Sequence, residues 1–183
     1  MAWTSTSPFI RIRVYYWNYR EAVPCTTGYQ ADSTTSDCFE ICGDGFLYAL
    51  ACDDGNILDG DGCSSACTIE VGWNCSGGSH THASVCTEVC GDGLLFNFAC
   101  DDGNLINRDG CSSTCTIEAG FNCMDGSPLT ASTCTEICGD GFLYALACDD
   151  GNTLSGDGCS STCALETGWN CAGGSFSTPS VCT

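Results

Sequence analysis

The feature that most constrains this chain is a cysteine pattern that repeats without insertion or deletion. The string Ile41-Cys-Gly-Asp-Gly returns at Val89 and again at Ile137, a period of 48 residues. Each copy carries six cysteines, and Cys25 and Cys38 precede the first copy, which accounts for all 20 cysteines among the 183 residues. This density is typical of small secreted domains that disulfides stabilise in place of a large core. We therefore expect an extracellular or cell-surface location.

The repeat also sets the expected domain boundaries. We predict an N-terminal extension over 1–24, a partial repeat over 25–40, and full repeats over 41–88, 89–136 and 137–183. Only Thr87-Glu88-Val89 separates the last cysteine of the first repeat from the first cysteine of the second. So short a linker favours an elongated rod of small disulfide-rich tandem repeats, mostly irregular with short β-hairpins.

The partial repeat indicates part of the disulfide connectivity, because its two cysteines have no other local partner. We predict that the fifth and sixth cysteines of every repeat pair, giving Cys25–Cys38, Cys75–Cys86, Cys123–Cys134 and Cys171–Cys182. For the other four we prefer first to third and second to fourth, the EGF-like order, which joins Cys42 to Cys63 and Cys52 to Cys67. Zinc is the alternative use of so many cysteines, but the wide spacings and the presence of only two histidines favour disulfides.

Four short motifs occur in all three copies: CGDG, CDDGN, DGCSS-x-C and E-x-G-[WF]-N-C. In the first copy they include Cys52-Asp-Asp-Gly-Asn, Asp61-Gly-Cys-Ser-Ser-Ala-Cys67 and Glu70-Val-Gly-Trp-Asn-Cys75. This pattern resembles the Myxococcus-type cysteine-rich repeat of bacterial and protist surface proteins over Ile41 to Thr183. It is more distantly similar to the Lin-12/Notch-type repeats, which are small calcium-binding disulfide units. The resemblance implies an extracellular, turn-rich module without catalytic activity.

The chain departs from that family pattern before each CDDGN, where a polar turn is usual. It has the mainly apolar stretches 46–51, 94–99 and 142–147 instead. One interpretation is that they fill the small core. The other is that they pack between chains, since exposed apolar patches mark contacts. On the second interpretation the assembly residues include Phe46, Tyr48, Phe142 and Tyr144.

Carboxylate and amide side chains recur at spacings that a calcium loop uses, which makes calcium the one cofactor to consider. The candidate ligands are Asp53, Asp54, Asn56 and Asp61, then Asp101, Asp102, Asn104 and Asp109, then Asp149, Asp150, Asn152 and Asp157. The alternative is that Asp-Gly and Gly-Asn form structural turns. Threefold repetition of the same acids does not suit a glycosidase, which needs two differently tuned carboxyl groups in one cleft. No set of nucleophile, base and oxyanion donor is evident, so we expect a protein that is not an enzyme.

The net charge of −19, with four arginines and no lysine, excludes a basic face for nucleic acid. No apolar run approaches the ~18 residues of a membrane span. Glycans are a further expected partner or modification. The only N-x-[ST] sequon is Asn74-Cys75-Ser76, so we expect sugars on loop hydroxyls instead, at Ser79, Thr81, Ser84, Ser175, Ser177 and Thr178. His80 and His82 lie in one of these loops, and a solvated loop suits them better than a metal site.

The segment Phe9 to Tyr19 belongs to no repeat and has the β-branched and aromatic content of a strand. Its candidate assembly residues are Ile10, Arg11, Ile12, Arg13 and Val14. Such a strand either covers the partial repeat of its own chain or docks on an acidic edge of a preceding subunit. The second arrangement predicts a filament subunit that assembles head to tail. The alternative is a monomeric adhesin, or a calcium-dependent binding module of a larger surface protein.

Overall fold

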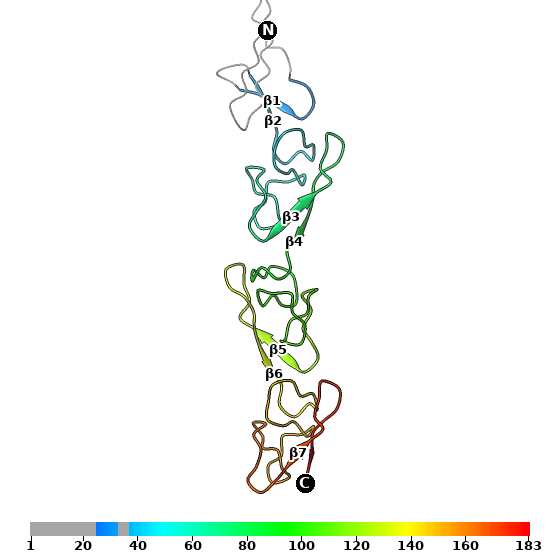
Figure 1. The fold of residues 1–183 in the computed structure, drawn as a ribbon. Coiled ribbons are helices and arrows are strands. Elements are labelled where there is room, and N and C mark those ends of the chain that lie inside the picture. Colours follow the sequence, from blue (N-terminus) through cyan, green and yellow to red (C-terminus); the bar gives the residue numbers. More distant parts are fainter. Residues whose placement is uncertain (1–24, 33–36) are drawn as a thin grey trace, which may run out of the picture. The chain divides into compact units, whose positions relative to one another are not determined.

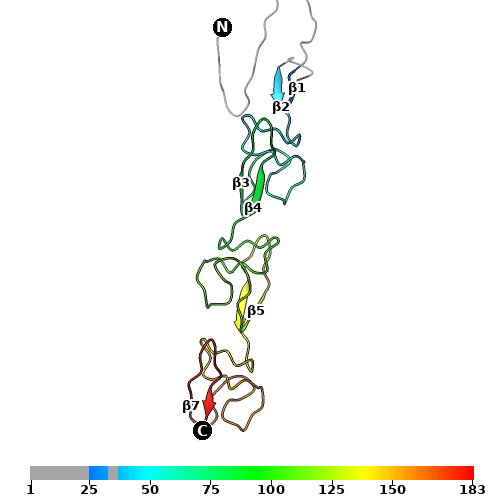
Figure 2. The ribbon, with the colours of Figure 1, turned by 90° about the vertical axis from the view of Figure 1, so that its right-hand side faces the viewer.

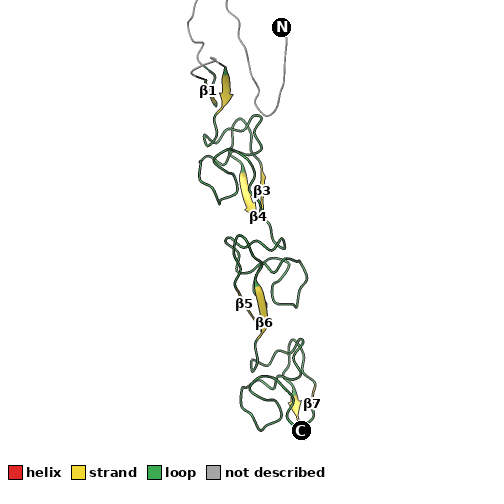
Figure 3. Ribbon diagram, turned by 90° about the vertical axis from the view of Figure 1, so that its left-hand side faces the viewer, coloured by secondary structure: helices red, strands yellow, loops and turns green. Residues whose placement is uncertain are grey.

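The structure is a computed structural model that describes residues 25–32 and 37–183. It divides into two compact units, one ending at Glu88 and one running from Val89 to Thr183. The described residues contain no helix, and most of them lie in turns and loops (Figure 3). Their only regular elements are short antiparallel strand pairs. The predicted class, small disulfide-rich repeats with short hairpins, is confirmed.

Each repeat contributes one two-stranded hairpin (Figure 1). In the first unit β1 (Tyr29–Ala31) pairs with β2 (Cys38–Glu40), and β3 (Trp73–Ser76) pairs with β4 (Val85–Glu88). In the second unit β5 (Phe121–Met124) pairs with β6 (Thr133–Glu136), and β7 (Cys171–Ala172) pairs with β8 (Val181–Cys182). The register places Cys75 opposite Cys86, Cys123 opposite Cys134 and Cys171 opposite Cys182. A disulfide therefore crosses each of these three hairpins.

The other four cysteines of a repeat form a nested pair of bridges, and here the prediction of an EGF-like order is wrong. Cys42 pairs with Cys67, and Cys52 pairs with Cys63. The second and third repeats have the same connectivity. In the partial repeat, Cys25 pairs with Cys38. All 20 cysteines are thus in ten bridges.

An unusual backbone conformation accompanies the nested order at the fourth cysteine. Cys67 has a φ of +53°, in the left-handed region that non-glycine residues rarely adopt. It lies in the turn from Ser64 to Thr68, where the Ser64 amide donates to the Thr68 carbonyl and the Cys67 amide donates to the Ser64 carbonyl.

Each repeat has a small core built mainly from cysteine. In the first repeat Cys52, Cys63 and Cys67 are buried, and Leu50 packs against them. The hairpin docks on this core at Gly62, where a Cβ atom would collide with Cys86. The corresponding Gly110 and Gly158 meet Cys134 and Cys182 in the same way. Because so small a module buries little apolar surface, the bridges replace most of a conventional core.

Two predictions concern features outside the described structure of the two units. The predicted N-terminal strand, with assembly residues Ile10 to Val14, lies outside the described residues. The elongated rod concerns how the two units are arranged, and it stays a prediction.

Candidate functional site

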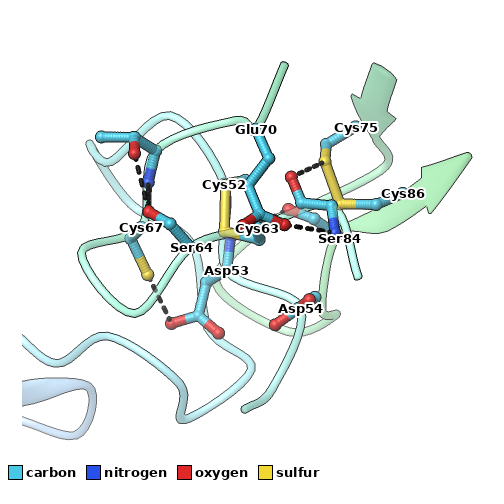
Figure 4. Close-up of a disulfide and its surroundings, with 12 residues drawn as sticks. Cys52, Asp53, Asp54, Cys63, Ser64, Cys67, Glu70, Cys75, Ser84 and Cys86 are labelled. Carbon is cyan, nitrogen blue, oxygen red and sulfur yellow. Dashed lines mark hydrogen bonds between the residues drawn. A yellow bond between two sulfur atoms is a disulfide. The ribbon is translucent and has the colours of Figure 1, made fainter. Parts of the chain in front are cut away.

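A buried carboxylate holds together the turn motifs that recur in each repeat. Asp53 is fully buried, and its two oxygens accept hydrogen bonds of 2.9 Å from the backbone amides of Gly43, Gly45 and Gly55. Its Oδ2 also lies 3.7 Å from the sulfur of Cys67 (Figure 4). One side chain therefore fixes CGDG against CDDGN and brings Cys42, the neighbour of Gly43, toward Cys67.

The same carboxylate recurs as Asp101 and Asp149, both fully buried, with the corresponding three glycine amides as donors. These three of the twelve predicted calcium ligands thus each accept three backbone amides. Six others each accept one backbone amide from the residue two positions later: Asp54, Asn56, Asp102, Asn104, Asp150 and Asn152. A group of Cys90, Asp101 and Cys115 has the spacing of a metal site, and Cys138, Asp149 and Cys163 form a second such group. Their sulfurs are joined in disulfides, so they offer no thiolate to a metal.

The remaining predicted ligands form a separate oxygen cluster in each repeat. In the first, the Asn56 amide donates to Asp61 Oδ2 at 3.0 Å, and Asn152 donates to Asp157 Oδ2 at 3.2 Å in the third. The other oxygen, Oδ1 of Asp61 and of Asp157, is buried and has no hydrogen-bond donor among the described residues. Burial, and then the nearby charge of Asp61, raise the pKa of Asp54. Asp102 has a raised pKa from burial and from Asp109. In the first two repeats, the neighbouring carboxylates of the cluster therefore repel one another.

A second arrangement joins consecutive repeats inside each unit. Glu136, at the end of β6, accepts hydrogen bonds of 2.7 to 3.1 Å from the amides of Tyr144, Ala145 and Leu146 in the next repeat. Glu40, at the end of β2, accepts the corresponding three from residues 48–50. The linker glutamate is thus a cap for the loop that follows it. Hydrogen bonds to a carboxylate are among the stronger ones in proteins.

A tyrosine completes each of these joints. Tyr144 donates its hydroxyl to the carbonyl of Ala119 at 2.8 Å, and its ring lies 4.7 Å from that of Phe121. In the first unit Tyr48 donates to Thr27 at 3.2 Å, with its ring 5.1 Å from that of Tyr29. In Figure 2 the hairpin labelled β5 lies next to the third repeat, which the chain enters after the partner strand β6.

The apolar stretches therefore have two roles. Leu47 and Leu143 lie against the hairpin loops of their own repeats, at Gly78 and Gly174. Leu50 and Leu146 pack on the cysteine cores. The tyrosines contact the preceding hairpin of the same chain, as does Phe142 at Gly120. Phe46 is half-buried, and its amide donates to Asp44.

The predicted glycan sites differ in accessibility. Thr81, Ser177 and Thr178 are exposed, and Ser79 and Ser175 are partly exposed. Ser84 is only 6% exposed, and its hydroxyl accepts the amide of Asp53, so it is not accessible in the folded chain. The predicted solvated position of the histidines agrees with the structure, since His80 and His82 are both exposed.

Sequence reasoning missed two groups of structural side chains. One is the linker glutamates Glu40 and Glu136. The other is Glu70, whose carboxylate accepts the amides of Gly60 and Gly62 at 2.8 Å. The available signal was the recurrence of glutamate in Phe39-Glu40, Thr87-Glu88 and Thr135-Glu136, immediately before each CGDG string.

These features define a class: tandem cysteine-rich repeats with a buried aspartate, nested bridges and a bridged hairpin. Residues 23–68, 70–116 and 120–164 match the model of a domain of unknown function, DUF4215, and the chain belongs to that family. No curated protein matches the chain.

Each matched segment starts with a hairpin and continues into the cysteine core of the following repeat. The family unit and the predicted repeat share one period but are counted from different starting points. In the segment 23–68, the hairpin and core are the two parts that Glu40 and Tyr48 hold together. Within the described ranges, no helix has the length and apolarity that a membrane crossing needs.

Proposed function

We propose that the chain is a structural subunit of an extracellular or cell-surface filament, assembled head to tail from disulfide-bonded repeats. The observation that carries this proposal is the joint inside each unit, where Glu136 and Tyr144, or Glu40 and Tyr48, bind one repeat to its neighbour. Such joints suit a load-bearing scaffold. The extracellular placement is supported by ten disulfides and by the resemblance to Myxococcus-type repeats of surface proteins. The role is not catalytic.

Sedimentation velocity over a range of concentrations, with electron microscopy of the same samples, tests this proposal. We expect the mass to rise with concentration and fibres to appear. Arg11→Ala combined with Arg13→Ala should weaken assembly, because the extension supplies positive charge to an acidic chain. Arg108→Gly is the matched control, since the other repeats have glycine at that position. A chain that stays monomeric at all concentrations rejects the filament and favours the adhesin.

Calcium binding is a second candidate function. The supporting observation is the buried Oδ1 of Asp61 and of Asp157, each without a donor, in a cluster of like charges. Carboxylate and amide oxygens are the ligands that calcium prefers. Titration calorimetry with calcium should give binding that Asp54→Asn weakens. Asp125→Asn, an equal charge change at an exposed loop position, should leave it unchanged. Equal heats for both variants and the unaltered chain contradict the site.

Glycosylation of the exposed loop hydroxyls is part of the proposed surface role. Thr81, Ser177 and Thr178 are accessible to a transferase, whereas Ser84 is not. Peptide mapping of the native protein by mass spectrometry should place sugars on the first three residues. Sugar on Ser84 would instead require modification before folding.

A further inference from the structure

The hairpin end that receives a tyrosine has a defined composition, which we call the tyrosine socket. It consists of a carbonyl, a glycine and an aromatic ring: Thr27, Gly28 and Tyr29 in the first unit, and Ala119, Gly120 and Phe121 in the second. Tyr48 and Tyr144 fill these two sockets. A Cβ atom on Gly28 or Gly120 would lie 2.6 or 2.9 Å from the tyrosine ring, and both glycines are buried.

The third repeat has the same socket in Thr167, Gly168 and Trp169. Gly168 has a φ of +92°, close to the +83° of Gly28 and the +86° of Gly120, so the backbone is already in the receiving conformation. Yet no described atom lies within 4 Å of a Cβ built on Gly168. Gly168 is exposed, and Trp169 is 37% exposed. The third socket therefore has the backbone conformation of the other two, but none of the described residues occupies it.

The tyrosines of the chain narrow the choice of occupant. Of its six tyrosines, Tyr48 and Tyr144 are seated in sockets, and Tyr29 is a wall of one. The remaining three, Tyr15, Tyr16 and Tyr19, are all in the N-terminal extension. The distribution of charge also favours the N-terminal extension as the occupant. The third repeat, 137–183, has five acidic residues and no basic one, whereas the extension holds Arg11, Arg13 and Arg20.

We propose that Thr167, Gly168 and Trp169 bind a tyrosine from the Phe9–Tyr19 stretch of a second copy of this chain. The inference rests on the proposed head-to-tail assembly and names its interface. The tyrosine hydroxyl donates to the Thr167 carbonyl, and its ring packs over Gly168 against Trp169. Each subunit then repeats between molecules the joint that it contains within each unit. The contact joins two different surfaces, the socket of one copy and the tyrosine stretch of the next, so it can propagate from copy to copy.

Complementary variants of the full chain test the interface. The socket variant is Trp169→Ala, and the tyrosine variant carries Tyr15→Ser, Tyr16→Ser and Tyr19→Ser together. Each alone should associate about tenfold or more weakly than the unaltered chain, as truncation of an aromatic anchor does. An equimolar mixture should form a 1:1 dimer that does not grow, because it contains one intact interface. Leu129→Ala, which truncates a side chain that is 87% exposed in the second repeat, should associate normally.

The outcomes separate this inference from the proposed function. If the unaltered chain never associates, both are rejected. If the unaltered chain associates and both variants associate as strongly as it does, the assembly stands and the socket is overturned. The same conclusion follows if the mixture of the two variants associates no more strongly than either variant alone. Hydroxyl-radical footprinting of the unaltered chain covers the case in which Trp169→Ala misfolds. Oxidation of Trp169 should slow several-fold on assembly, and an unchanged rate overturns the inference.

Discussion

Asp53 and Asp54 are adjacent residues with the same side chain and opposite electrostatic situations. Asp53 is buried and accepts hydrogen bonds from three backbone amides. Asp54 is beside Asp61, and its pKa is raised, chiefly by burial and also by that neighbouring charge. The neutral substitution Asp→Asn should therefore have opposite effects at the two positions.

Asp53→Asn should destabilise the first repeat by about 3 kcal/mol, because it replaces a charged acceptor of several buried hydrogen bonds with a neutral amide. Chemical denaturation with the disulfides intact measures this loss. Asp101→Asn and Asp149→Asn should behave alike in their own repeats, since their carboxylates have the same donors. An unchanged denaturation midpoint for all three would mean that the bridges alone define the fold.

Asp54→Asn should leave stability unchanged or raise it slightly at neutral pH in the presence of a chelator. A carboxyl group with a raised folded pKa stabilises the fold below its unfolded pKa of about 3.9. That contribution is lost as the pH rises through the folded pKa. Thermal unfolding of both proteins across the acidic range should show the advantage of the variant growing as the pH increases. A variant that becomes relatively less stable with rising pH contradicts the like-charge cluster.

Arg108 occupies a backbone position that suits glycine. Its φ is +78°, where Gly60 and Gly156 of the other repeats have +97° and +103°. Its guanidinium carbon lies 4.2 Å from the ring centre of Phe176 in the next repeat. The unfavourable backbone is therefore accompanied by a cation–π contact within the second unit.

A double-mutant cycle with Arg108→Gly and Phe176→Ala should give a coupling of about 0.5–1 kcal/mol, the range for a partly exposed cation–π pair. The coupling is calculated from the unfolding free energies of the unaltered chain, the two single variants and the double variant. Replacing Pro128 of the second repeat, which occupies the same loop position as Phe176, is the control and should show no coupling to Arg108.

At the level of elements, the hairpin, the linker and the next loop act together. Glu136→Gln removes the charge that three amides share, so hydrogen exchange at residues 144–146 should accelerate about tenfold, equivalent to about 1.4 kcal/mol. Asp125→Asn is the control. It makes an equal charge change at an exposed loop position of the second repeat, so exchange at residues 144–146 should stay the same.

The joint should also respond to alkaline pH. Burial, and then the charge of Glu118, raise the pKa of Tyr144, and burial followed by Glu40 raises that of Tyr29. A phenol with a raised folded pKa stabilises the joint below its unfolded pKa of about 10, and that stability is lost as the pH rises through the folded value. Ultraviolet difference titration should detect late ionisation, and Tyr144→Phe should remove one late-ionising group.

Sequence and structure agree most closely where the chain repeats itself. The hairpins were predictable because the partial repeat isolates the cysteines that bridge them. The nested bridges were not predictable, because four cysteines allow three pairings and their spacing alone does not choose among them. The left-handed conformation of Cys67, Cys115 and Cys163 also has no signal in the sequence. The role of Asp53 was hidden for a related reason. Asp-Gly strings suit calcium loops and turns equally, and only burial distinguishes an acceptor of amides from a metal ligand.

At the level of the whole molecule, charge and covalent linkage dominate. A net charge of −19 on 183 residues opposes association of like copies, unless the few arginines face acidic surfaces. Assembly that depends on such pairs should weaken as salt rises from about 10 mM to 1 M, because screening shortens from ~30 Å to ~3 Å. Sedimentation at fixed protein concentration measures this. Assembly that strengthens steadily with salt indicates a mainly apolar interface.

The nested bridges have a mechanical consequence. In the first repeat, Cys42–Cys67 closes the chain from 42 to 67, and Cys75–Cys86 closes it from 75 to 86. A pulling force passes across these bonds and cannot extend the segments inside them. Only residues 68–74 and the linker 87–89 are free to lengthen, which is roughly 35 Å at about 3.5 Å per residue. Even a repeat that has lost its hydrogen bonds under tension stays short, and only reduction of its disulfides would release the remaining length.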